Sequence, residues 1–99
     1  MEIYGNQCLI VTPLREDGAI DEPSTRRLID FVIDSGVHGV LAQGSTGEGF
    51  LFTTAERKAF MELVVKSVGG RVPVGFSIES PATAISVDLA RHAARVGVD

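Results

Sequence analysis

Residues 39–48 have the sequence Gly39-Val40-Leu41-Ala42-Gln43-Gly44-Ser45-Thr46-Gly47-Glu48. The apolar stretch 39–42 predicts a short buried strand, and the polar, glycine-flanked remainder predicts a loop. An amphipathic segment follows, and Thr53 with Glu56 three residues later forms a capping-box pattern that predicts the start of a helix. The order strand, loop, helix is one βα unit.

The same unit occurs on both sides of this stretch. Upstream, the apolar run 7–11 predicts a strand, and Asp21 is expected to cap the helix that follows. Downstream, residues 72–76 predict a third strand and residues 84–96 a third helix. Repeated βα units imply a parallel sheet with right-handed crossovers, and both a doubly wound sheet and a barrel fit this pattern.

Within the second helix, periodicity separates an apolar face from a polar face. The buried face is expected to comprise Ala59, Phe60, Leu63, Val64 and Val68. The outward face is expected to comprise Arg57, Lys58, Glu62 and Lys66.

Composition excludes several classes of function. The net charge is −4 over 99 residues, and the nine Lys and Arg residues form no basic stripe that could neutralise the phosphates of a nucleic acid. The single cysteine, Cys8, excludes an internal disulfide and a cysteine-based metal site, and His38 and His92 lack metal-ligand spacing. No apolar run approaches the ~20 residues of a membrane span, and the first residues do not resemble a signal peptide, so we expect a cytoplasmic protein with no metal.

The loop 44–48 is the most informative for function. Its position at the end of a parallel strand is where reactive groups collect in such folds, and the hydroxyls and N–H groups of Ser45 and Thr46 suit a carboxylate or another small anion. Alternatively, the hydroxyls only satisfy the backbone of their own loop. The sequence Gly-Lys-Ser/Thr of a P-loop and the three-glycine dinucleotide fingerprint are both absent.

Several motifs occur in a characteristic order along the chain. They are Val11-Thr12-Pro13, Gly18, Gly36-x-x-Gly39, Gly44-Ser45-Thr46-Gly47-Glu48, Thr53-x-x-Glu56, Val72-Pro73-Val74 and Ala82-Thr83-Ala84. Together they resemble the dihydrodipicolinate synthase / N-acetylneuraminate lyase family over essentially the whole chain. The resemblance implies the first three βα units of a (β/α)8 TIM barrel, with residues 1–99 as the N-terminal part of a single domain and a fourth strand beginning near residue 98.

The resemblance also implies a lyase or aldolase that acts on pyruvate or another 2-oxo acid through a lysine Schiff base, without a cofactor. In that family the pair matching Ser45 and Thr46 holds the carboxylate of the keto acid, and the Ser45 position joins a proton relay. Gly44, Gly47, Glu48 and Thr12 are expected to support the loop, Glu48 by accepting N–H groups. The full-length family members usually assemble as homotetramers.

The family carries its Schiff-base lysine on the sixth strand and its principal tyrosine at the end of the fifth. The only lysines here are Lys58 and Lys66, and Tyr4 matches no catalytic position. We therefore expect the isolated 99 residues to be inactive. Two alternatives are a non-catalytic part-barrel that folds only with a partner chain, and an independent small α/β fold that binds an anion at residues 44–48.

The sequence departs from the family pattern at three positions. Glu79 follows the third strand, where it would place a carboxylate near the mouth of the site or be an exposed residue beside a helix start. Gln43 occupies a position where smaller residues are common, and it would reach either a ligand or its own loop. Leu14 stands where phenylalanine is usual.

Overall fold

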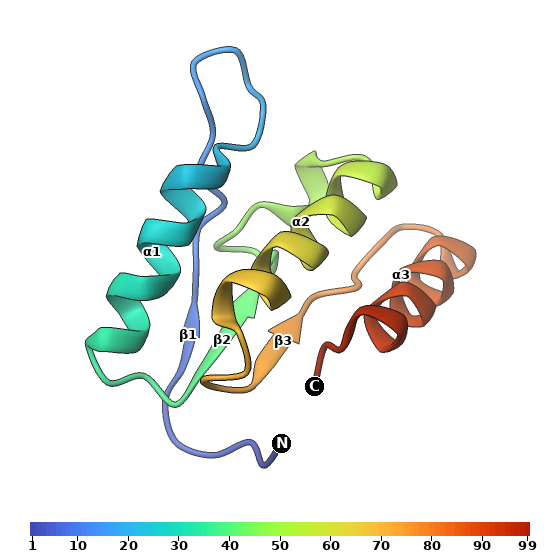
Figure 1. Cartoon of the computed structure of the whole chain (residues 1–99). Helices are drawn as coiled ribbons and strands as arrows, with labels where there is room; N and C mark the ends of the chain where they lie inside the picture. Colours follow the sequence, from blue (N-terminus) through green and yellow to red (C-terminus); the bar gives the residue numbers. More distant parts are fainter.

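The computed structural model describes residues 1–99 and contains a three-stranded parallel sheet in the order β1-β2-β3. A helix follows each strand (Figure 1). The elements are β1 (Gln7–Leu9), α1 (Glu22–Asp34), β2 (Gly39–Ala42), the 3-10 helix η1 (Gly49–Leu51), α2 (Thr54–Val68), β3 (Val74–Phe76) and α3 (Thr83–Val96). The predicted succession of βα units and the parallel sheet are confirmed.

Two strands are shorter than predicted. β1 ends at Leu9, although the ladder continues through one more bond from the Ile10 N–H to the Leu41 carbonyl at 3.0 Å. Val11 lies beyond the end of this ladder and, like the paired residue Leu9, is 52% exposed. β3 begins only at Val74 because Pro73 has no N–H to donate to the ladder.

The helices cover one face of the sheet and leave the other bare. Side chains alternate between the two faces of a strand, and Val40 and Ala42 on β2 are fully buried beneath the helices, together with Phe60 and Val64 of α2. Figure 1 shows α1, α2 and α3 side by side along the sheet. On the opposite face Leu9 is 52% exposed, so this face has no layer of its own to cover it.

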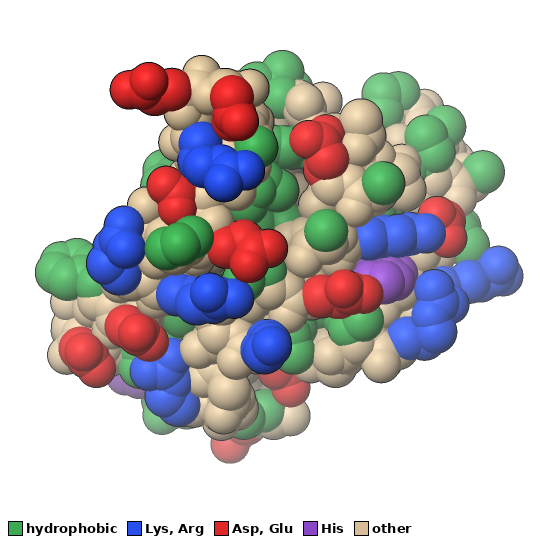
Figure 2. Space-filling view, turned by 45° about the horizontal axis from the view of Figure 1, so that its top comes forward, with side chains coloured by type: hydrophobic (Ala, Val, Ile, Leu, Met, Phe, Trp, Pro, Cys, Tyr) green, Lys and Arg blue, Asp and Glu red, His purple; other side chains and the backbone are tan.

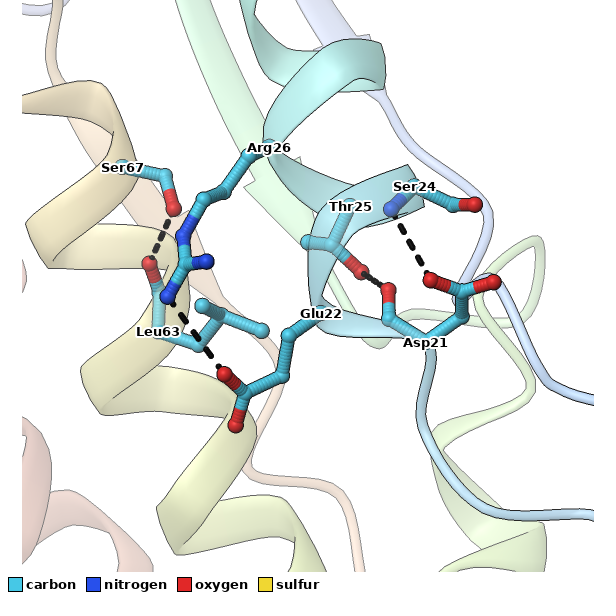
Figure 3. A network of polar contacts seen from close by, with 7 residues as sticks. All are labelled: Asp21, Glu22, Ser24, Thr25, Arg26, Leu63 and Ser67. Atoms are coloured by element: carbon cyan, nitrogen blue, oxygen red, sulfur yellow. Dashed lines mark hydrogen bonds and ion pairs between the residues drawn. The ribbon is translucent and has the colours of Figure 1, made fainter.

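The start of α1 is fixed by local hydrogen bonds (Figure 3). The Asp21 carboxylate accepts the Ser24 N–H at 3.0 Å, and the buried Thr25 hydroxyl donates to the Asp21 carbonyl at 2.8 Å. The hydrogen bond from Ser24 lowers the pKa of Asp21. Asp21 is therefore the N-cap, as predicted.

The capping box of α2 is also confirmed, but the orientation of two side chains is not. The Thr53 hydroxyl accepts the Glu56 N–H at 3.1 Å, and the Glu56 carboxylate accepts the Thr53 N–H at 2.9 Å. Ala59 is exposed rather than buried, because it lies one turn before the solvent-facing Glu62. Arg57 was expected to face outward, yet it is only 4% exposed.

The last residue lies beside the free edge of β3. The Asp99 N–H donates to the Val74 carbonyl at 2.9 Å, and the Val74 N–H donates to the Asp99 carboxylate at 3.0 Å. These bonds occupy the place at which a fourth parallel strand would begin.

The helix-bearing side carries acidic and basic side chains interspersed over its surface (Figure 2). None of the three helices is both long and apolar enough to span a bilayer.

Candidate functional site

The loops that follow β1 and β2 meet at the carboxyl edge of the sheet. The Thr12 hydroxyl donates to the Gly47 carbonyl at 2.7 Å, which ties the first loop to the second. The Gln43 side-chain amide lies 3.5 Å from the same hydroxyl. The segment 43–48 is thus held from the β1 side by a side chain that sequence reasoning named as loop-supporting.

The loop 44–48 makes two tight turns that require small residues. The Glu48 N–H donates to the Ser45 carbonyl at 3.1 Å, and the Gly49 N–H donates to the Gly44 carbonyl at 3.3 Å. A Cβ on Gly47 would lie 2.9 Å from Cα of Gln43, and one on Gly49 would collide with the Gln43 carbonyl. The glycines therefore permit a backbone approach that no other residue allows.

Ser45 and Thr46 stand exposed at the tip of this loop. Neither side-chain hydroxyl makes a hydrogen bond within the chain, and neither backbone N–H has a protein partner. The alternative in which these hydroxyls serve only their own backbone is therefore wrong. Two hydroxyls and two N–H groups remain available for an anionic ligand.

Glu48 does not brace the loop through its side chain, in contrast to the expectation. Its carboxylate is exposed and accepts no hydrogen bond. Its backbone has a left-handed φ of 54° at the turn before η1. Glu48 contributes a turn instead of a carboxylate contact.

Gln43 is buried, and its side chain contacts the loop that follows β1. Only 1% of it is exposed, and it too has a left-handed φ of 54°. The side-chain nitrogen reaches Thr12 at 3.5 Å, whereas its Oε1 has no hydrogen-bond partner. The expected contact of the side chain with its own loop is therefore wrong, because its partner Thr12 belongs to the loop after β1.

The residue that sequence reasoning missed is Arg57. Its guanidinium donates through Nη1 to the Glu79 carbonyl at 2.6 Å and through Nη2 to the Ser77 carbonyl. Burial lowers the pKa of Arg57, and the nearby Glu79 carboxylate partly offsets this shift. Helical spacing places position 57 on the same stripe as Phe60 and Val64, so the periodicity contained the signal.

Glu79 borders a cleft that neither Ser45 nor Thr46 lines. Its exposed side chain lines this cleft of about 530 Å³ between the start of α2 and the start of α3. The other lining residues are Gly49, Phe50, Phe52, Thr53, Thr54, Arg57, Ser80, Pro81 and Ile85. No residue of the loop 44–48 lines this cleft, so the structure does not place the Glu79 carboxylate beside the two hydroxyls.

The lysines and the tyrosine lie away from the loop. Lys58 pairs with Asp88 of α3, with 2.7 Å between Nζ and Oδ2, and this hydrogen bond lowers the pKa of Asp88. Lys66 is exposed on α2. Tyr4 packs beside His38, with 5.0 Å between ring centroids, at the opposite end of the strands.

Comparison with known proteins decides the family. The model of the dihydrodipicolinate synthetase family matches residues 3–99. The chain belongs to the dihydrodipicolinate synthetase family. The curated 4-hydroxy-tetrahydrodipicolinate synthase of Methylobacterium radiotolerans is 40% identical over 97 residues, which are 98% of this chain and 32% of that protein.

Solved structures of the family agree with the fold. The prophage protein YagE of Escherichia coli K12, a family member solved in complex with pyruvate, superposes with a TM-score of 0.91 at 32% identity over 95% of this chain and 32% of YagE. CdNal of Clostridium difficile, solved with mannosamine, gives a TM-score of 0.96 at 27% identity over 100% of this chain and 34% of CdNal.

The chain spans about a third of the length of these relatives. The solved neighbours are TIM-barrel proteins, so the three βα units are part of a (β/α)8 barrel, as predicted. The bare face of the sheet corresponds to the barrel interior, because barrel helices lie on the outside.

Proposed function

We propose that residues 1–99 are the N-terminal third of a single TIM-barrel lyase that acts on pyruvate or another 2-oxo acid through a lysine Schiff base. The relatives are lyases, and YagE was solved with pyruvate, which supports this substrate class. The observation that carries the proposal is the set of unpaired hydroxyls and N–H groups on Ser45 and Thr46 at the carboxyl edge of the sheet.

Ser45 and Thr46 would hold the α-carboxylate of the keto acid. Their two hydroxyls and two N–H groups are neutral donors, and each donates a directional hydrogen bond. Together they would fix the orientation of the bound carboxylate. With the carboxylate fixed, the adjacent carbonyl carbon is oriented toward the attacking amine, and orientation of this kind supplies a large part of the rate in covalent catalysis. The Ser45 hydroxyl would also pass a proton during addition or cleavage. Thr12, Gly44, Gly47 and Glu48 would shape the loop.

The attacking lysine would come from a later strand. Lys58 is bound to Asp88 and Lys66 is exposed on the outer side of α2, so neither faces the barrel interior. The attacking amine must reach the keto carbon of the bound substrate, which these two side chains do not. The 99 residues alone would therefore be inactive. The complete protein would be a cytoplasmic homotetramer that needs no metal or cofactor.

Borohydride trapping tests this proposal. The full-length chain is the complete lyase that we propose, of which residues 1–99 are the N-terminal third. Incubated with pyruvate and borohydride, it should gain a covalent adduct on a lysine beyond residue 99, and the isolated 99 residues should gain none. An adduct on Lys58 or Lys66 contradicts the proposed mechanism.

A chimera tests the contribution of this segment directly. Residues 1–99 would replace the matching third of the Methylobacterium radiotolerans synthase, which supplies the remaining strands. Pyruvate trapping should persist in the chimera and weaken in its Ser45→Ala and Thr46→Val variants. Thr83→Ala, which changes an exposed hydroxyl at the start of α3, is the control that should leave trapping unchanged.

A second candidate is a non-catalytic part-barrel that folds only with a partner chain. The observation in its favour is the bare sheet face, where Leu9 is 52% exposed, together with two open strand edges. Sedimentation of the 99 residues distinguishes the two candidates. A stable, stoichiometric assembly that traps no pyruvate supports the part-barrel, whereas aggregation of the isolated segment supports the fragment of an enzyme.

A further inference from the structure

Arg57 closes a ring of contacts around the candidate carboxylate loop. Its Nη2 donates to the Ser77 carbonyl, and the Ser77 N–H donates to the Ala42 carbonyl at 3.0 Å. Ala42 is the last residue of β2, and the chain runs from it through the loop 44–48 and η1 to Arg57 on α2. The two ends of this segment are therefore joined through Ser77 as well as along the backbone.

Burial of the Arg57 guanidinium is unfavourable, so its place in the interior calls for a specific role of its hydrogen bonds. Arg57 is 4% exposed, no carboxylate lies within ion-pair distance, and its Nε has no partner. Burial of a cation costs free energy that a well-packed apolar side chain would avoid. Stability alone gives a weak reason for arginine at this position.

The planar fork of arginine does what an apolar side chain or a lysine does not. It donates at once to the carbonyls of Ser77 and Glu79, which lie two residues apart in the loop after β3. A lysine ammonium has no rigid fork with which to hold both carbonyls at a fixed spacing. The loop after β3 is thereby fixed against the start of α2.

We infer that Arg57 is a positioning residue, which holds Ser45 and Thr46 where they can bind the keto-acid carboxylate. The inference rests on the proposed function. On the β1 side, the Thr12 hydroxyl anchors the loop at Gly47. On the β3 side, the contacts from Arg57 through Ser77 to Ala42 join the two ends of the segment 42–57. We assign Arg57 no contact with the substrate, because its guanidinium reaches the loop through the backbone of Ser77 and Ala42.

A positioning role and a purely structural role give different readouts in the full-length chain. If Arg57 only stabilises the fold, its removal lowers the melting temperature and the fraction of active protein, while the pyruvate concentration for half-maximal trapping stays the same. If Arg57 positions the carboxylate loop, that concentration rises, because small misplacements of binding groups weaken binding and orientation strongly.

The experiment is borohydride trapping over a series of pyruvate concentrations on the wild-type, Arg57→Ala, Arg57→Lys and Arg26→Ala proteins, each with a thermal melt. We expect the half-saturating concentration to rise roughly tenfold in Arg57→Ala and by a smaller factor in Arg57→Lys. Ethylguanidinium, which can enter through the cleft that Arg57 lines, should restore Arg57→Ala toward wild type. Arg26→Ala, at an exposed arginine of α1, should match wild type.

Unchanged half-saturation in Arg57→Ala overturns the inference, even if the melting temperature falls. If Arg57→Ala does not fold, half-saturation in Arg57→Lys decides in the same way, and an unchanged value overturns the inference. Absence of the adduct in the wild-type protein refutes the proposed function, and this inference with it. A wild-type adduct combined with unchanged variants refutes only the role of Arg57.

Discussion

Thr12→Val removes one hydroxyl from the candidate site and leaves the shape of the side chain almost unchanged. That hydroxyl donates to the Gly47 carbonyl at 2.7 Å and is the only partner of the Gln43 side-chain nitrogen. Gly47 is buried, so its carbonyl loses a bond that water cannot easily replace. A lost hydrogen bond costs ~1 kcal/mol, and a carbonyl left unsatisfied in the interior raises the cost to about 1–3 kcal/mol.

The free energy of unfolding of the full-length chain should therefore fall by about 1–3 kcal/mol in Thr12→Val, measured by urea denaturation. Pyruvate trapping should also need a higher pyruvate concentration, because the Ser45 and Thr46 turn is anchored through Gly47. Thr12→Ser keeps the hydroxyl and serves as the matched control. A Thr12→Val protein with wild-type stability and wild-type half-saturation would refute the idea that Thr12 anchors the loop.

Three further predictions concern the loop and the helix caps. Gly47→Ala should destabilise the full-length chain in urea by about 1–3 kcal/mol, because its Cβ would lie 2.9 Å from Cα of Gln43. Gly44→Ala, whose Cβ would meet only Leu41 at 3.6 Å, is the control, and equal costs would argue against the loop geometry. Thr53→Ala should lower the unfolding free energy by ~1 kcal/mol through loss of the capping box, and an unchanged melting temperature would contradict this role. The pKa of Asp21 is lowered from 3.8 in the folded chain. Its contribution to stability is therefore present above pH 3.8 and is lost as the pH falls through the lower folded-state pKa. Asp21→Asn should remove this part of the acid dependence, measured by thermal melts across the same pH range.

Local signals predicted the elements of this fold well because short-range contacts determine them. Asp21 caps α1 through a residue three positions away, and Thr53 caps α2 through Glu56, so each cap is contained in a few residues of sequence. Strand ends were less predictable. β1 ends opposite Leu41, one residue before the end of β2, and β3 begins after Pro73. The length of each strand therefore depends on its pairing as well as on its own apolar run.

The barrel did not follow from periodicity. Three parallel strands in sequential order with helices on one face also form half of a doubly wound sheet. The ordered motifs around the loop 44–48 suggested the barrel, and the family match with the solved neighbours confirmed it.

The position of the candidate loop could be predicted from the sequence, but the contacts of several side chains around it could not. The polar, glycine-flanked loop at the end of β2 was expected, and the structure places Ser45 and Thr46 at its exposed tip. The expected bracing by the Glu48 carboxylate was wrong, because this carboxylate is exposed and accepts no hydrogen bond from the loop. Arg57 was missed because its charge suggested solvent, although its partners lie 20 and 22 residues away on another loop.

The most direct test of the account is a crystal structure of the full-length chain with pyruvate bound. The account predicts that the pyruvate carboxylate lies within hydrogen-bond distance of the Ser45 and Thr46 hydroxyls or N–H groups, with its keto carbon joined to a lysine from beyond residue 99. A carboxylate bound elsewhere, with these two residues turned away from the barrel interior, would contradict it.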